Sequence, residues 1–143
     1  MKEILFKGFH PDENGAEKVF VNGEWISGEW VQGYYSALKA PSTGEIKHVI
    51  FSFDRAADYV IPETVGEYTG LTDKNDKLIF EGDICRAKDT IHNGAVQIKG
   101  AVFKVMQKKG CWIICHNEEW DFLYTNAKDI EVIGNIHENP ELL

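Results

Sequence analysis

The side chains with the clearest chemical capacity lie in the segment Cys111-Trp112-Ile113-Ile114-Cys115-His116. Thiolates and imidazoles are preferred zinc ligands. The segment is apolar enough to form a strand, in which Cys111 and Cys115 share a face but stand roughly 13 Å apart at ~3.3 Å per residue. One tetrahedral zinc, with sulfur ligands at ~2.3 Å, cannot span that separation, and His116 points to the opposite face from Cys115. The sequence therefore predicts no metal site and small buried thiols instead.

Enzymatic chemistry finds little other support in the chain. A cysteine nucleophile needs a base and an electropositive setting, and folding could bring any of the five histidines near a thiol. Acidic residues gather at turns, where solvation explains them, and no glycine-rich loop opens a helix to hold a phosphate. We expect a non-enzymatic protein without a cofactor. A hydrolytic or thiol enzyme is kept as an alternative class of function.

Aromatic side chains are the remaining candidates for a functional surface. Trp120, Phe122 and Tyr124 alternate along a predicted strand, so they would form one stripe, with Asp121 and Leu123 on the other side. Aromatic platforms on small β barrels bind single-stranded nucleic acid when basic residues lie beside them, but here acidic residues flank the stripe. We predict that the stripe is a core or subunit-interface surface, with a ligand platform as the alternative.

Composition sets the broad class of the protein. The chain has 143 residues, of which 43% are hydrophobic and 12% aromatic, which predicts a packed core. Its net charge of −8 is opposite in sign to that of proteins that bind nucleic-acid phosphates over a broad surface. The densest basic cluster, Lys104 with Lys108 and Lys109, is expected to be a solvated strand end and turn.

Three cysteines do not suggest a disulfide framework, and neither a signal peptide nor a long apolar segment is recognisable. These features predict a soluble cytoplasmic protein that does not enter a membrane.

Period-two patterns dominate the chain and predict short strands separated by turns. Asn22-Gly23 is a strong hairpin signal, and its near-copy at Ser27-Gly28 predicts a second turn. Helical turns are expected only at Asp54–Tyr59 and Asn126–Asp129. The expected strands are 2–7, 19–21, 24–26, 31–35, 46–53, 77–80, 84–87, 95–98, 102–107, 111–116, 119–124 and 130–137.

Strands at this spacing indicate a mainly β protein, a small barrel or sandwich of short antiparallel strands with one or two short helical turns. The turn before Ile84 is weakly typical of small SH3-like barrels, which makes such a barrel a candidate for the second half. We expect one domain over residues 1–143, with a division into two β subdomains near 54–65 left open.

The segment Val60–Ile84 combines turn residues with short apolar runs. Gly70 and Gly82 are interpreted as backbone turns, and Asp73 to Asp76 as a solvated hairpin tip. The apolar side chains between them are candidates for the core: Tyr68, Leu71, Ile79, Phe80 and Ile84.

Three separated motifs carry a family resemblance. They are Val60–Leu71 with Glu81–Ile84, the amino-terminal Met1–Gly8 with Gly28–Tyr34, and the closing Ile130–Leu143. Together, and in the order in which they follow one another along the chain, they resemble the YopX family of phage and prophage proteins over essentially the whole chain. The stretch from Ala87 to Gly100 departs from the commoner family pattern and looks like a lengthened hairpin loop.

The resemblance implies a small accessory protein of a bacteriophage or prophage, in the cytoplasm of a bacterial host, and a homo-oligomer. It brings no biochemical activity. The leading hypothesis is therefore a non-enzymatic, oligomeric protein-interaction module with an unidentified protein partner. The alternative is a nucleic-acid-binding small β barrel in phage replication or regulation.

Overall fold

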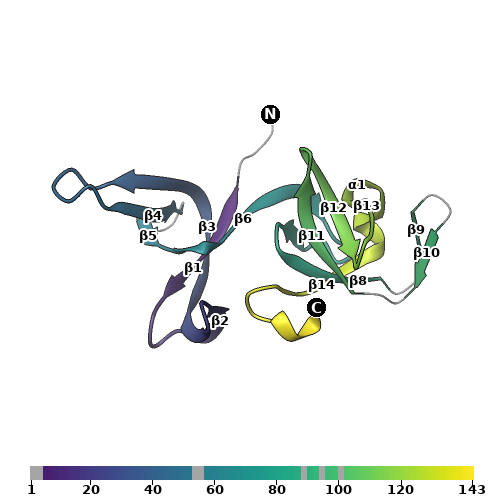
Figure 1. Cartoon of the computed structure of the whole chain (residues 1–143), viewed down its shortest axis with the longest axis horizontal. Helices are drawn as coiled ribbons and strands as arrows, with labels where there is room; N and C mark the ends of the chain where they lie inside the picture. Colours follow the sequence, from purple (N-terminus) through teal and green to yellow (C-terminus); the bar gives the residue numbers. More distant parts are fainter. Residues whose placement is uncertain (1–4, 53–56, 88–89, 94–95, 100–101) are drawn as a thin grey trace. The chain divides into compact units, whose positions relative to one another are not determined.

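The computed structural model describes residues 5–52, 57–87, 90–93, 96–99 and 102–143, with the backbone alone for 90–93 and 96–99 (Figure 1). The chain forms two compact units, Met1–Tyr68 and Thr69–Leu143. The boundary between the units falls after the 54–65 segment, and the single-domain description stays a prediction. None of the described helices is long and apolar enough to cross a membrane.

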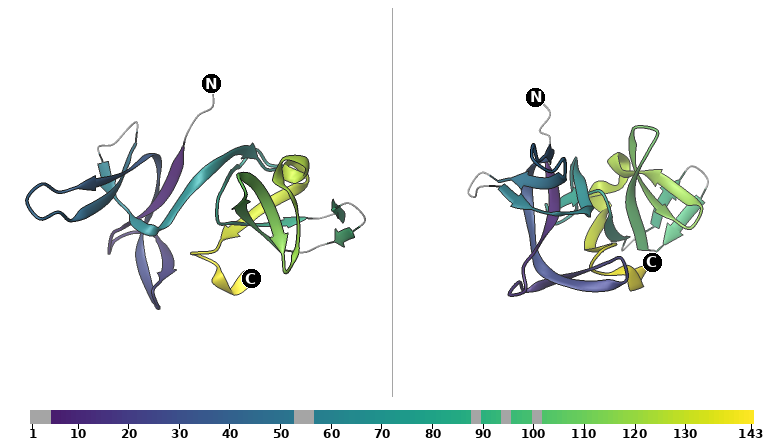
Figure 2. Two further views of the ribbon diagram at one scale, coloured as in Figure 1. Left: turned by 45° about the horizontal axis from the view of Figure 1, so that its top comes forward. Right: turned by 60° about the vertical axis from the view of Figure 1, so that its left-hand side comes forward.

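The first unit is built from antiparallel strands. Their order in the sheet is β5-β4-β3-β1-β6-β7, with β2 paired to β3 (Figure 2). Strand β6 continues from the first unit into the second, where β7 follows it. The strands of the first unit are β1 (Phe6–Pro11), β2 (Glu17–Val21), β3 (Glu24–Lys39), β4 (Ile46–Phe51), β5 (Ala57–Tyr59) and most of β6 (Ile61–Thr72). Strand β7 (Leu78–Phe80) belongs to the second unit.

The β2–β3 hairpin confirms the turn predicted at Asn22-Gly23. Both residues have positive φ, 51° and 85°, as a two-residue hairpin turn requires. The second turn predicted at Ser27-Gly28 is wrong, because β3 runs unbroken for 16 residues. A Cβ on Gly28 would collide with the carbonyl oxygen of His10. Glycine at this position therefore allows two neighbouring strands to approach closely and does not form a turn.

Residues Ala57–Tyr59 do not form the helical turn that was expected at Asp54–Tyr59. They form strand β5, which pairs with β4. The rest of that expectation, residues 54–56, lies outside the described residues. Likewise, side chains of the lengthened loop expected between Ala87 and Gly100 lie outside the description. Within this stretch, β9 (Thr90–Asn93) pairs antiparallel with β10 (Val96–Lys99).

The first unit has two small groups of buried side chains. Phe9, Val19 and Val21 form one, and Val31, Ile50 and Val60 form the other. The register of the pairing between β1 and β6 shifts between Lys7 and Phe9. The buried hydroxyl of Thr64 accepts the Phe9 N–H at 2.9 Å and donates to the Ile61 carbonyl at 2.6 Å. This side chain supplies hydrogen bonds where the regular ladder is interrupted.

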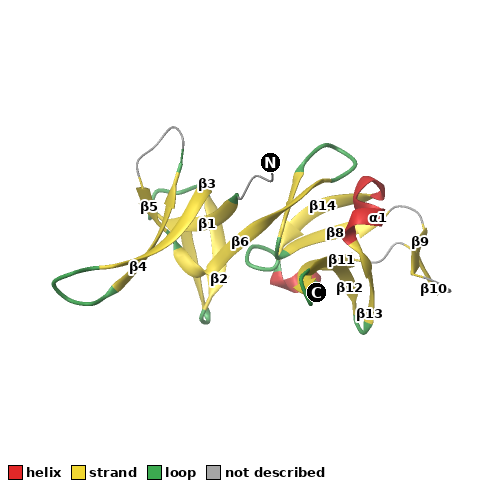
Figure 3. Ribbon diagram, turned by 90° about the horizontal axis from the view of Figure 1, so that it is seen from above, coloured by secondary structure: helices red, strands yellow, loops and turns green. Residues whose placement is uncertain are grey.

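The second unit is a five-stranded antiparallel sheet in the order β13-β12-β11-β8-β14 (Figure 3). Its core gathers the inward side chains of these strands, including Phe103, Val105, Ile114 and Ile130. Short helices follow β13, as expected for 126–129, and also end the chain. The elements are β8 (Asp83–Ala87), β11 (Val102–Lys108), β12 (Cys111–His116), β13 (Glu119–Phe122), α1 (Leu123–Asn126), η1 (Ala127–Asp129), β14 (Ile130–Asn135) and η2 (Pro140–Leu142).

The prediction of a mainly β fold with short antiparallel strands and one or two helical turns is confirmed. In the described residues both large sheets are open, because the first and last strands of each order are not paired with one another. The barrel form of the expectation, SH3-like in the second half, is therefore not adopted. Closure depends on long-range pairing between edge strands, which local periodicity does not reveal.

The turn at the start of the second unit corrects one expectation. Gly70 and Gly82 have φ of 84° and 88°, which confirms their role as turns. Asp73, however, is not part of a solvated tip, because its side chain is only 1% exposed. Of the core candidates, Ile79, Phe80 and Ile84 are buried, Leu71 packs partly buried against the core, and Tyr68 is partly buried.

Candidate functional site

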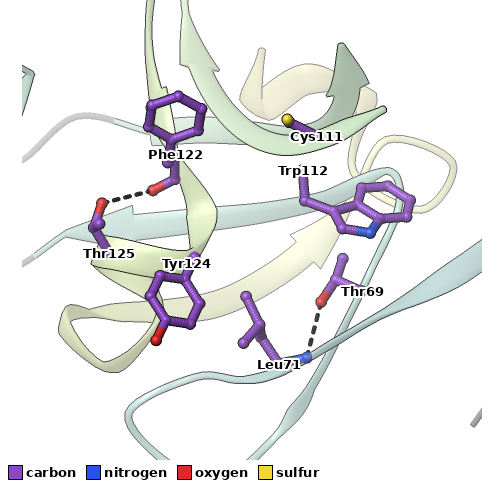
Figure 4. A pocket seen from close by; sticks show the side chains of 7 residues that line it. All are labelled: Thr69, Leu71, Cys111, Trp112, Phe122, Tyr124 and Thr125. Atoms are coloured by element: carbon purple, nitrogen blue, oxygen red, sulfur yellow. Dashed lines mark hydrogen bonds between the residues drawn. The ribbon is translucent and has the colours of Figure 1, made fainter. Parts of the chain in front are cut away.

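An apolar hollow of about 430 Å³ opens on the second unit (Figure 4). None of the seven side chains that line it is charged. They come from the end of β6, the start of β12, the end of β13 and α1. The lining residues are Thr69, Leu71, Cys111, Trp112, Phe122, Tyr124 and Thr125.

The wall from β13 and α1 is fixed by a sharp change of backbone direction. Phe122 is extended, and Leu123, fully buried in the core, begins the helix. The Phe122 carbonyl accepts hydrogen bonds from the Thr125 hydroxyl at 3.1 Å and the Asn126 amide at 2.8 Å. Because Leu123 is held inward, Phe122 and Tyr124 on either side of it stay exposed, at 46% and 80%.

The opposite wall is held by Thr69. Its hydroxyl donates to the Ile79 carbonyl at 2.8 Å and accepts the Leu71 N–H at 3.2 Å. Gly70 between them has a positive φ, which lets Leu71 turn toward the core. In Figure 4 the Leu71 side chain lies between the indole of Trp112 and the ring of Tyr124. The hollow thus has a floor tied to the core and an aromatic rim.

The structure separates the three residues of the predicted stripe. Trp120 and Phe122 share a face of β13, with ring centroids 5.4 Å apart in an edge-to-face contact. The strand expected to reach Tyr124 ends at Phe122, so Tyr124 lies on α1. Phe122 and Tyr124 line the hollow, whereas Trp120 lies beside Phe122 and carries the Lys108 ammonium 4.9 Å from its ring. Their role as an interaction surface stays a prediction.

Apart from Phe122 and Tyr124, the lining residues were not predicted to share a surface with the stripe. Among them, Leu71 was expected in the core, and Trp112 was considered as a strand aromatic within the cysteine segment. Both are partly buried, packing on the core while lining the hollow. No local signal marks this double role, because the two residues come from strands that are distant in the sequence.

The thiols have three different environments. Cys85 is fully buried, and burial, followed by the negative charges of Asp83 and Asp73, raises its pKa far above the ordinary value. The Cys115 thiol lies 3.4 Å from the sulfur of Met106. Cys111 is exposed at the hollow, so the prediction of small buried thiols in the 111–116 segment is wrong for Cys111, which lies at the start of β12 beside the turn.

No described group of three or more His, Cys, Asp or Glu side chains could hold a metal ion. His116 instead places its Nδ1 3.0 Å from the Val102 carbonyl oxygen, and its ring meets the ring of Phe103. The hollow therefore offers apolar surface, aromatic edges and a few hydroxyls. Such a set suits the burial of a partner's side chain.

Comparisons with known proteins place the chain in a family. A family model described as YopX protein matches residues 13–143. The crystal structure of protein EF1440 from Enterococcus faecalis is similar over 100% of this chain and 99% of that chain, with 25% identity and a TM-score of 0.47. The comparison with curated proteins finds no match. Since the family model covers nearly the whole chain, the protein belongs to the YopX family.

Proposed function

We propose that this protein is a non-enzymatic, homo-oligomeric protein-interaction module that serves a phage or prophage in the cytoplasm of a bacterial host. The observation that carries the proposal is the uncharged hollow with its exposed rim of Phe122 and Tyr124. Interface centres are enriched in aromatic residues and depleted of charge. The predicted surface of Trp120, Phe122 and Tyr124 includes both rim residues.

The hollow has the properties of a site that receives one large apolar side chain. Its volume of about 430 Å³ is in the usual range for ligand pockets. Tyr124 and Trp112 have few rotatable bonds, so they lose little conformational entropy when a partner covers them. The threonine hydroxyls of the wall are already engaged with backbone groups. The expected partner therefore presents a short segment with one aromatic or aliphatic side chain at its centre.

The test is affinity capture from phage-infected or prophage-induced cells with three baits. These are the wild type, the double variant Phe122→Ala/Tyr124→Ala, and the control Phe20→Ala, which removes a 40% exposed aromatic of the first unit. We expect a partner that survives moderate salt with the wild type and the control and is lost with the double variant. Capture of no partner that depends on the hollow would overturn the interaction-module proposal.

A specific observation also supports nucleic-acid binding as the second candidate. Lys104 and Lys108 lie on the face of β11 whose cross-strand neighbours on β12 are Cys115 and Cys111. Cys115 in turn pairs with Trp120, so lysines and an aromatic ring share one surface. Alternation along β13 places the neighbouring carboxylates on the other face. Adjacent cations and aromatics are what single-stranded nucleic acid requires.

Fluorescence titration with single-stranded and duplex oligonucleotides at low salt separates the two candidates. The interaction-module proposal predicts no salt-dependent binding. Binding that weakens with salt and falls in Lys108→Gln would favour the nucleic-acid candidate, because phosphate contacts release counterions.

A further inference from the structure

We propose that the exposed face of the β3–β4–β5 part of the first unit is the surface through which two copies of the chain associate. The inference rests on the proposed function, since it assigns a surface to the self-association proposed there. It leaves the hollow of the second unit to a different partner.

Large apolar side chains cover this face. Cross-strand pairing sets Tyr34 opposite Phe51 and Val49 opposite Tyr59, and Leu38 lies further along β3 on the same side. Tyr34 is 53% exposed, Phe51 42%, Tyr59 59% and Leu38 45%, whereas Val49 in their midst is 4% exposed. The face is therefore an apolar patch in which exposed aromatic and aliphatic side chains surround a covered Val49.

The opposite face of the same strands is already used by the core. Ile50 is fully buried there, and the Tyr35 hydroxyl lies 2.6 Å from Nδ1 of His48, whose ring stacks on the Tyr35 ring. Alternation then holds the exposed residues outward. An antiparallel sheet with one buried face ordinarily carries polar side chains on the other. Here the solvent side is apolar, which marks it as an interaction surface.

Charge on this face favours a second copy over other partners. Among the described residues of β3, β4 and β5, the charged side chain on this face is Lys47. Its ammonium lies 3.2 Å from a carboxylate oxygen of Glu45 and 5.5 Å from the centroid of the Tyr59 ring. Nucleic acid would require a row of cations, and a basic protein would require carboxylates. Because the face carries almost no net charge in a chain of −8, two copies can meet there without burying like charges.

The area also fits association of two copies. At about 200 Å² for each complete large side chain, the exposed fractions of Tyr34, Leu38, Phe51 and Tyr59 amount to about 400 Å². A stable interface buries about 800 Å² per partner, of which somewhat more than half is apolar. The patch supplies most of that apolar part. A two-fold axis would bring the same patch of each copy together, so that the apolar side chains of one copy cover those of the other.

The test compares the molecular mass of variants in solution by light scattering after size-exclusion chromatography, over a range of concentrations. The variants are Tyr34→Glu/Tyr59→Glu and the control Trp25→Glu. Trp25 lies on the same strand as Tyr34 and is equally exposed at 53%, so the control matches the Tyr34→Glu half of the double variant in exposure and in added charge. We expect an oligomeric wild type and control, and self-association weakened by about tenfold or more in the double variant.

The outcomes separate the inference from the proposal beneath it. A double variant that keeps the wild-type mass, or a control that dissociates equally, overturns the assigned surface and leaves the homo-oligomer standing. A wild type that is monomeric at every concentration overturns both the surface and the homo-oligomeric part of the proposed function. Circular dichroism checks that each variant is folded. If Tyr34→Glu/Tyr59→Glu does not fold, Tyr34→Ala/Tyr59→Ala, which adds no charge, takes its place and must show the same weakened self-association.

Discussion

Replacement of Asp73 by Asn is expected to destabilise the second unit more than any other substitution in the 73–76 turn. One carboxylate oxygen of Asp73 accepts the N–H groups of Asn75 at 2.8 Å and Lys77 at 3.0 Å. The other accepts the N–H of Val132 on β14 at 2.9 Å. The side chain thus closes its own turn and ties that turn to a strand 59 residues away.

The magnitude follows from which hydrogen bonds an amide can keep. The amide oxygen of the substituted side chain can serve Asn75 and Lys77, but its NH₂ group then faces the Val132 N–H, and both are donors. A buried N–H left without an acceptor costs about 1–3 kcal/mol, and the two remaining bonds lose their charge assistance. We expect Asp73→Asn to lower the free energy of unfolding by about 2–4 kcal/mol, which lowers the melting temperature by roughly 10 °C for a chain of this size.

Asp76→Asn is the matched control. It removes the same charge from the same turn, but the Asp76 side chain is 91% exposed and its ion-pair partner, Lys128, is exposed as well. Asp76 also has a φ of 61°, a conformation that Asn adopts readily. We expect a change of no more than about 0.5 kcal/mol. Urea and thermal unfolding at neutral pH, followed by circular dichroism and tryptophan fluorescence, measure both variants.

The pH dependence supplies a second readout. Burial alone would raise the pKa of Asp73, but the N–H bonds from Val132, Lys77 and Asn75, with the charge of Lys77, outweigh it and lower the pKa below 3.8. A lowered folded pKa gives stability that is complete above the unfolded value and is lost as the pH falls through the folded one. The difference between wild type and Asp73→Asn should therefore be constant near neutrality and shrink below about pH 4. Equal stability of the two Asn variants, or a difference that grows in acid, would refute the reasoning.

Two further predictions concern buried groups. Thr64→Val should lower the free energy of unfolding by about 1–3 kcal/mol, because the buried Phe9 N–H loses its acceptor, whereas Thr64→Ser keeps the hydroxyl; urea unfolding of both variants measures this. Cys85 should resist a disulfide reagent in the folded protein and react only after denaturation, because burial raises its pKa and blocks access. Exposed Cys111 should supply the fast-reacting thiol, and Cys111→Ser should abolish that fast phase; rapid labelling of Cys85 in the native chain would contradict the assigned core.

The strands and several turns were predictable because the forces that set them act over a few residues. Asn22-Gly23 forms the predicted hairpin because both residues tolerate positive φ, and Gly70 and Gly82 turn the chain for the same reason. Alternation of apolar and polar residues indicated most strands and the mainly β class. Local reasoning failed at Gly28, where a turn-forming residue lies inside a long strand because two neighbouring strands approach it closely.

The candidate site was only partly accessible in the same way. Phe122 was identified from alternation, and Tyr124 was identified with it although it lies on a helix. Leu71 and Trp112 join them only after β6 and β12 have folded around one core. Similarly, Glu119 and Asp121, which flank Trp120 in sequence, alternate to the other face of β13, and Lys108 reaches the Trp120 ring from β11.

The sequence by itself determined the class of fold, the position of several turns and the resemblance to the YopX family, which the family model confirms. Tertiary structure alone decided the order of the strands, the open sheets, the burial of Asp73 and the gathering of the hollow. The physical reason is that turn conformation and period-two burial are properties of neighbouring residues. The partner of a carboxylate or an aromatic ring, by contrast, is set by strand pairing across the chain, as the bond from Asp73 to Val132 shows.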